Sequence, residues 1–373
     1  MGKAEKERLN QTLNWHLSNI HDTLQMLDQT PPSTLNRVSW GEVVKMGDQI
    51  YKQATVVGML WSGETPKAKE IEENMQTYFN TLQGFLLLSQ GSTVGAGPTL
   101  SSSFNASIKQ VVDSSFKLMI ETVSSFGSGN KDLKLKVPQL VGAVWETCSA
   151  LKKTPATNIT AIGRAMTQVA VSVKDVLREM KELKPYSSKQ KDDTSHDAHS
   201  KEDSAACDSN DLSDDDLGND LSDEEMKIAQ SGTMVVSETI GFIKELIRTI
   251  TSLLKQEKPD DSGELVNCLE SLLKLCQEIG TQIDEIGACL YPPQEVSAMR
   301  TALEKMSNFI SEMQSEVENF ESSSESFFQV CNGLRKSIKQ MDSELECANT
   351  TEVEAKMLNL VVGNERNMKT STG

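Results

Sequence analysis

The stretch from residue 263 to residue 293 reads GELVNCLESLLKLCQEIGTQIDEIGACLYPP, and its pattern decides the fold. Apolar residues return every three or four positions, a spacing that places them on one face of an α-helix. They are Leu265, Cys268, Leu272, Leu275, Ile279, Ile283 and Ile286. The paired prolines at 292–293 then end the helix, because proline lacks the backbone N–H that a helix interior uses. The sequence predicts a long amphipathic helix that buries this face.

The same periodicity recurs along the chain, and strand-like alternation is almost absent. The other predicted helices cover residues 9–27, 43–60, 71–85, 100–126, 138–151, 159–183, 229–254, 296–320 and 327–345. Two of them open with the serine–glutamate spacing of a capping box, Ser39 with Glu42 and Ser222 with Glu225. Pro138 is expected to open the fifth helix. We therefore predict an all-α protein of two antiparallel helix bundles with four to six helices each. Frequent prolines and glycines disfavour the alternative, a single continuous coiled coil.

The charge of the chain is concentrated in its middle. The whole chain of 373 residues has a formal charge of −17, whereas residues 1–186 have a charge of +3. Residues 187–225 hold 14 acidic and 3 basic side chains and lack aromatic residues. Such a segment cannot bury enough surface to offset the entropy of ordering, so a disordered acidic linker is expected at 187–221. The predicted domains are bundles at 1–186 and 222–347, with a tail at 348–373.

Composition also limits the classes of function. An acidic chain lacks the positive footprint that general nucleic-acid or anionic-membrane binding requires, so direct contact with either is not expected. No apolar run approaches the roughly 20 residues of a membrane span, and the first residues show no apolar secretory signal. The seven cysteines form no Cys-x-x-Cys pair and do not indicate a disulfide framework. We expect a soluble intracellular protein.

The residues that could support catalysis or metal binding are few. His16 and His21 lie five positions apart, on different helix faces, and are expected to be exposed structural residues. His196, His199 and Cys207 could bind a soft metal, but they lie in the predicted disordered linker, where a tight site lacks a framework. We therefore expect no catalytic residue, no metal site and no cofactor.

Two other features are also interpreted structurally. Gly91 to Pro98 resembles a phosphate-binding loop, but the following Lys-Ser/Thr is missing, so a flexible connection between helices is expected. Cys268, Cys276, Cys289 and Cys331 lie on or beside apolar seams, where cysteine is usually a small buried hydrophobe.

The acidic segment contains a near-repeat, NDLSDDD at 210–216 and NDLSDEE at 219–225. In each copy a serine precedes three acidic residues, the substrate pattern of an acid-directed kinase. Phosphorylation at Ser213 and Ser222 is therefore a hypothesis. The alternative is a solvated spacer whose Ser222 only caps the next helix.

Several segments together resemble the cyclin-D-binding protein family, also described as Grap- and cyclin-D-interacting proteins. They are Val144–Glu146, Val169–Leu183, Pro185–Ser187, and Leu275–Leu290 followed by Tyr291-Pro292-Pro293. The order of bundle, acidic linker and bundle is also similar, and the resemblance covers most of residues 40–345. Residues 3–28 and the tail after Cys347 are not clearly covered.

The resemblance implies an all-helical, non-enzymatic negative regulator of cell-cycle progression. Members bind D-type cyclins and helix-loop-helix proteins, dampen cyclin-D-dependent kinase activity, and occur in cytoplasm and nucleus. Residues 266–270 approach the retinoblastoma-docking pattern Leu-x-Cys-x-Glu, but Val266 takes the first place and Cys268 is expected in the core.

A helix-bundle adaptor of the cytoskeleton, of the vinculin–talin type, is the alternative function, because fold alone does not fix function. Which bundle binds a partner, and the oligomeric state, are left open by the sequence.

Overall fold

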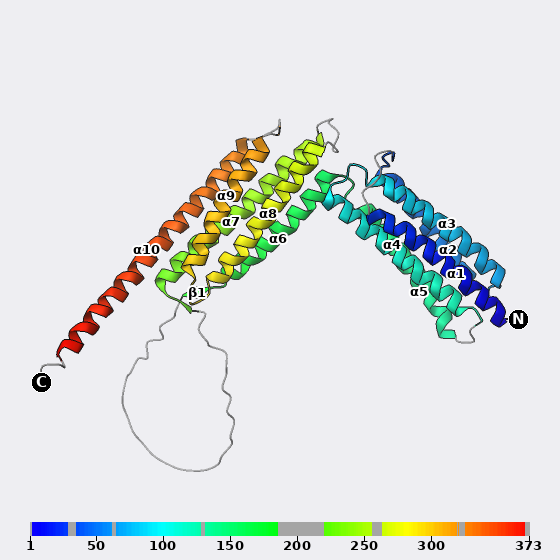
Figure 1. The fold of residues 1–373 in the computed structure, drawn as a ribbon, viewed down its shortest axis with the longest axis horizontal. Coiled ribbons are helices and arrows are strands. Elements are labelled where there is room, and N and C mark those ends of the chain that lie inside the picture. Colours follow the sequence, from blue (N-terminus) through cyan, green and yellow to red (C-terminus); the bar gives the residue numbers. More distant parts are fainter. Residues whose placement is uncertain are drawn as a thin grey trace, which may run out of the picture. The chain divides into compact units, whose positions relative to one another are not determined.

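The computed structural model describes residues 2–28, 35–61, 65–127, 131–185, 220–255, 263–318, 320 and 325–369. Within these ranges the chain is helical almost throughout, and its helices form two compact units (Figure 1). Unit 1 comprises Met1–Ala165 with Ile250–Ser271, and unit 2 comprises Met166–Thr249 with Leu272–Gly373. The all-α fold and the two bundles predicted from the apolar periodicity are confirmed.

Unit 1 is built on the first five helices. These are α1 (Gly2–Gln25), α2 (Trp40–Leu60), α3 (Ala68–Ser92), α4 (Pro98–Ser125) and α5 (Lys131–Ala150). Two indole groups show that α2 and α5 are antiparallel. Trp40 Nε1 donates to the carbonyl oxygen of Leu151 at 3.0 Å, just past the end of α5, whereas Trp145 Nε1 donates to Thr55 Oγ1 at 3.1 Å.

Aromatic side chains make up much of the core of unit 1. Trp40 stacks on Phe104 with ring centroids 4.1 Å apart. Tyr78 is fully buried and donates its hydroxyl to Ser115 Oγ at 2.9 Å. The Tyr78 hydroxyl is therefore satisfied inside the core, as burial requires.

Both predicted capping boxes contribute to helix starts. The backbone N–H of Ser39 donates to Glu42 Oε2 at 3.1 Å at the start of α2. At the start of α7 (Asp223–Ser252), Ser222 N donates to Glu225 Oε2 at 2.9 Å, and Glu225 N donates to Ser222 Oγ at 3.2 Å. These bonds engage backbone donors that a helix N-terminus otherwise leaves unpaired.

Two helix boundaries differ from the prediction. Helix α5 begins at Lys131, so Pro138 lies inside it and does not open it. The proline removes one backbone N–H, yet the helix continues on both sides. Helix α10 runs from Glu325 to Lys369, beyond the expected end of the second bundle at residue 347.

Unit 2 contains most of the remaining helices. They are α6 (Asn158–Met180), α7, α8 (Gly263–Cys289), α9 (Val296–Glu318) and α10. The division between units falls inside α6, α7 and α8. Helices α9 and α10 are antiparallel. Arg300 Nε donates to Asp342 Oδ1 at 2.9 Å, and further along α9 Gln314 Oε1 accepts from Arg335 Nη1 at 2.7 Å.

The predicted first bundle covers residues 1–186, whereas α6 from Met166 onward belongs to unit 2. The reason is close packing on α8. A Cβ placed on Gly280 would lie 2.9 Å from Val169 Cγ1, and one on Gly287 would lie 2.8 Å from Val176 Cγ1. Both contacts advance by seven residues in the same direction, so α6 and α8 run parallel with a heptad register.

A short parallel pairing holds both ends of the acidic segment in unit 2. Strand β1 (Lys184–Pro185) pairs with β2 (Asp220–Leu221), and Leu221 is fully buried. The predicted linker at 187–221 therefore has its last two residues in a strand. Its other residues lie outside the described ranges, and the segment connects α6 to α7.

Candidate functional site

The two histidines that the structure describes, His16 and His21, do not form a reactive cluster. His16 is only 4% exposed and stacks on Phe79 with ring centroids 4.8 Å apart, so the expectation that it would be exposed is wrong. Its Nε2 has no hydrogen-bond partner, and burial lowers the pKa of its imidazole. His21 is exposed and its ring contacts Gln25. His196 and His199, with Cys207, lie outside the described residues.

Four of the described cysteines are buried apolar groups, whereas Cys268, expected in the core, is half-buried and Cys347 is exposed. The buried cysteines are Cys148, Cys276, Cys289 and Cys331. Burial raises the pKa of Cys148 and of Cys276 to about 12, and that of Cys331 to about 11. A thiol with such a pKa is protonated at neutral pH and is a poor nucleophile.

The glycine-rich connection before α4 is occupied by the protein itself. The N–H of Gly97 donates to Asn158 Oδ1 at 2.7 Å, and Asn158 Nδ2 donates to the carbonyl oxygen of Gly95 at 2.9 Å. Thr99 N and Thr99 Oγ1 donate to the two carboxylate oxygens of Glu270, at 2.9 and 2.7 Å. The donors that would hold a phosphate are therefore engaged, and the loop is an anchored connection between helices.

The hydrogen bonds between Glu270 and Thr99 also show whether residues 266–270 can act as a retinoblastoma-docking motif. Val266 is buried, and Glu270 is committed to Thr99 at the N-terminus of α4. Because its two anchor positions face the protein interior, this stretch is part of the fold and does not present a docking motif.

The two serines of the phosphorylation hypothesis are placed differently. Ser213 lies outside the described residues. Ser222 is exposed and caps α7 through the reciprocal bonds with Glu225. The capping role of Ser222 is confirmed, and its phosphorylation stays a prediction.

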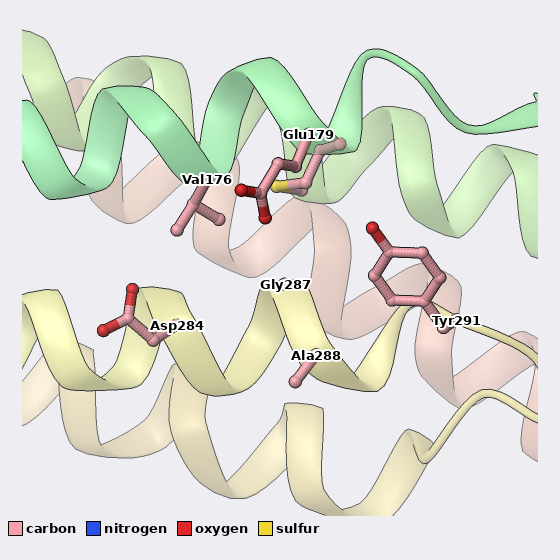
Figure 2. A pocket seen from close by; sticks show the side chains of 7 residues that line it. Val176, Glu179, Asp284, Gly287, Ala288 and Tyr291 are labelled. Atoms are coloured by element: carbon pink, nitrogen blue, oxygen red, sulfur yellow. The ribbon is translucent and has the colours of Figure 1, made fainter.

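A groove between α6 and α8 of unit 2 is the most distinctive surface feature that the sequence did not predict. Its volume is about 430 Å³, and its lining comes only from these two helices and the residue Tyr291 just after α8. The lining residues are Val176, Glu179, Met180, Asp284, Gly287, Ala288 and Tyr291. Figure 2 shows Glu179 and Val176 reaching from α6 into the space toward α8, with Asp284 on the opposite side.

The floor of this groove follows from sequence. Gly287 has no side chain, which lets Val176 approach the α8 backbone, and Ala288 adds only a methyl group. Tyr291 is 40% exposed at one end, where Figure 2 shows its hydroxyl directed toward α6. The sequence feature that could have predicted this packing is the seven-residue spacing of Gly280 and Gly287, which matches the spacing of Val169 and Val176.

The walls of the groove carry like charges. Burial, and then the negative charge of Glu179, raise the pKa of the Asp284 carboxyl. Among the described residues neither side chain has an ion pair or a hydrogen bond. The site can therefore supply a negative electrostatic field and a small apolar floor, which suits recognition of a cation and not nucleophilic chemistry.

In the part of the chain that the structure describes, no group of three or more histidine, cysteine, aspartate or glutamate side chains is arranged to hold a metal ion. No helix in the same ranges combines the length and apolar character needed to cross a bilayer.

Comparison with known proteins identifies the family. Residues 42–186 match the family model described as Grap2 and cyclin-D-interacting, N-terminal, and residues 201–315 match the C-terminal model of the same description. The chain is 22% identical over 224 residues to a Xenopus laevis protein named Cyclin-D1-binding protein 1 homolog. That match covers 57% of this chain and 59% of the relative, so the chain spans about three fifths of the relative's length.

The matched ranges agree with the segments that carry the resemblance, and they leave α1 outside. Both groove helices fall within them, because α6 lies in the N-terminal match and α8 in the C-terminal match. From its two matched halves, this chain belongs to the family of Grap2- and cyclin-D-interacting proteins.

Proposed function

We propose that this protein binds a D-type cyclin and helix-loop-helix factors, and that it restrains cell-cycle progression by occupying their surfaces. The observation that carries the proposal is the family match on both halves of the chain. The name of the Xenopus laevis relative, which refers to cyclin D1 binding, supports the same partner class.

Helix bundles suit this role because a partner helix can lie in the groove between two bundle helices. Its anchors at positions i, i+3, i+4 and i+7 then enter the spaces between side chains. The α6–α8 groove has this form, whereas the buried thiols and the engaged glycine loop contribute no reactive group. We therefore propose binding without turnover as the mechanism.

The direct test is a calorimetric titration of the purified full-length chain with a D-type cyclin from the same organism. The full chain is needed because a cut at residue 186 would separate α6 from the unit it packs in. We expect a Kd of about 1 μM or tighter, which corresponds to roughly −8 kcal/mol. Cyclin-dependent kinase activity should fall in step with occupancy.

The alternative role as a cytoskeletal adaptor predicts a different result. No binding to cyclin, together with co-sedimentation with actin filaments and a helical circular dichroism spectrum, would replace the regulator proposal by the adaptor. For a regulator of cyclins we also propose residence in both cytoplasm and nucleus, which imaging of the tagged full-length protein would check.

We further propose that an acid-directed kinase phosphorylates Ser213 and Ser222. At Ser222 a phosphate would add negative charge beside the Glu225 carboxylate that accepts from the Ser222 N–H at 2.9 Å. We expect the first turn of α7 to loosen as a result. Phosphopeptide mass spectrometry of protein from growing cells tests this proposal, and unmodified serines at both positions would refute it.

A further inference from the structure

Three carboxylates at other helix–helix seams of this protein have donors. Glu270 accepts two hydrogen bonds from Thr99, and Asp342 accepts from Arg300. Glu344 accepts from Ser231 across the contact between α7 and α10. A carboxylate that has lost part of its hydration is stabilised by such donors, so these three side chains contribute to the fold.

The α6–α8 groove departs from this arrangement. Glu179 and Asp284 approach it from opposite helices, and in the described part of the chain neither has a donor. Both side chains are exposed and their like charges repel each other, and partial desolvation and then this repulsion raise the pKa of Asp284. A positive group placed between them would relieve both costs.

The shape of the groove limits what can bring that positive group. Val176 packs on Gly287, and the small side chain of Ala288 leaves a shallow floor beside it, so a helix could approach closely. A long basic side chain suits the space because its methylene stem can lie on the apolar floor while its head reaches the carboxylates. Tyr291, exposed at one end, adds an aromatic face and a hydroxyl.

We propose that the α6–α8 groove is the docking site for an amphipathic helix of a partner protein, and that a lysine or arginine of that helix inserts between Glu179 and Asp284. This inference rests on the proposed function in one respect, that the partner is a protein. The acidic segment of this chain is excluded as occupant by its own charge, since residues 187–225 hold 14 acidic and 3 basic side chains.

The first test uses two labelled helical peptides of about 20 residues, roughly 30 Å long. They share an alanine–leucine face and differ only in carrying lysine or glutamate at the groove-facing polar positions. Fluorescence anisotropy with the full-length chain should show binding of the lysine peptide and not of the glutamate peptide. Salt should weaken that binding. Equal affinity for both peptides, or no binding of the lysine peptide, would overturn the inference.

Variants then locate the site. Replacing both carboxylates, Glu179→Gln with Asp284→Asn, should weaken lysine-peptide binding by roughly fivefold or more, the range of partly screened ion pairs. The matched control is Glu312→Gln, which removes an exposed carboxylate of α9 and should leave the affinity unchanged. An unchanged affinity in the double variant would contradict the proposed site.

A second substitution separates charge from bulk. Ala288 lies one helical turn after Asp284, so Ala288→Arg places an internal cation beside that carboxylate. Ala288→Gln adds similar bulk without charge. We expect the arginine variant to bind the lysine peptide several-fold more weakly than the glutamine variant does. Equal losses in the two variants would mean that the carboxylates are not used.

The same variants titrated with the D-type cyclin separate the two proposals. If cyclin binds the unaltered chain and the groove variants equally well, the groove inference fails and the proposed function stands. If cyclin binds none of them, the proposed function fails, and the peptide results alone decide the groove.

Discussion

Helix α8 carries two carboxylates, Glu270 and Asp284, that lie about four turns apart and have different surroundings. Glu270, in unit 1, accepts two hydrogen bonds from Thr99 at the N-terminus of α4. Asp284, in unit 2, faces Glu179 across a groove and has no donor among the described residues. The comparison teaches that the same side-chain chemistry on one helix can serve the fold at one position and remain available for binding at another.

The largest effect on the free energy of unfolding is expected at Glu270, whose carboxylate accepts two hydrogen bonds. Glu270→Ala removes the acceptor of the Thr99 N–H and hydroxyl and leaves donors at the start of α4 unpaired. We expect the free energy of unfolding of unit 1 to fall by about 2 kcal/mol. All four tryptophans lie in unit 1, so urea unfolding followed by tryptophan fluorescence reports on that unit.

The conservative variant Glu270→Gln tests whether the hydrogen bonds carry this effect. Its amide oxygen keeps one acceptor, so its loss of stability should be clearly smaller than that of Glu270→Ala. If the two variants lose the same stability, the negative charge at the helix N-terminus, and not the bonding geometry, stabilises α4.

The second effect concerns the floor of the open groove. Gly287→Ala places a methyl group 2.8 Å from Val176 Cγ1, and valine has little freedom to move because it is β-branched. We expect the overpacking to lower the free energy of unfolding of unit 2 by about 1–2 kcal/mol, despite the better helix propensity of alanine. Thermal unfolding followed by far-ultraviolet circular dichroism measures this loss.

Gly241→Ala in α7 is the matched control, because a Cβ there meets nothing within 4 Å. It should stabilise the protein by about 0.5–1 kcal/mol. A stabilising Gly287→Ala would contradict the close α6–α8 contact that forms the groove floor.

The helices themselves could be predicted from local pattern. Apolar spacing placed nearly every helix, and the pairs Ser39–Glu42 and Ser222–Glu225 form the bonds that their spacing predicts. These features depend on residues within a few positions of one another. The buried cysteines, such as Cys276 and Cys331, were likewise identified from their place on apolar seams.

The site could not be predicted in the same way because it depends on long-range contacts. The bond between Thr99 and Glu270 joins residues far apart in the chain, and no local pattern distinguishes Glu270 from Asp284. The assignment of α6 to the first bundle followed the position of the acidic segment. In the structure α6 from Met166 onward groups with unit 2, where it packs on Gly280 and Gly287.

His16 in unit 1 is a buried base whose Nε2 has no hydrogen-bond partner among the described residues. His16 packs on Phe79 with an unpaired Nε2, and burial lowers the pKa of its imidazole. In the pH range between the lowered and the ordinary value, the unfolded chain binds the proton and the folded chain does not. The free energy of unfolding of unit 1 should therefore fall as the pH is lowered from about 7.5 to about 5.5.

His16→Phe should remove this pH dependence, because phenylalanine keeps the stacked ring and cannot be protonated. His21→Gln alters an exposed histidine and should leave the dependence in place. Tryptophan fluorescence during urea unfolding at each pH provides the measurement. An identical pH dependence in His16→Phe and the unaltered chain would assign the effect to another group.

The smallest effect on stability is expected at Asp284, and its dependence on pH has the opposite sign to that of His16. Burial and Glu179 raise the pKa of Asp284, so the folded state holds its proton to higher pH than the unfolded chain does. Stability should therefore rise as the pH falls through that window, and Asp284→Asn should stabilise unit 2 at neutral pH by only a few tenths of a kcal/mol, since the groove is open to solvent. Urea unfolding followed by far-ultraviolet circular dichroism would detect the change, and Glu312→Gln should show none. A destabilised Asp284→Asn would mean that Asp284, like Glu270, already has a donor and serves the fold, which would remove the reason for a basic partner in the groove.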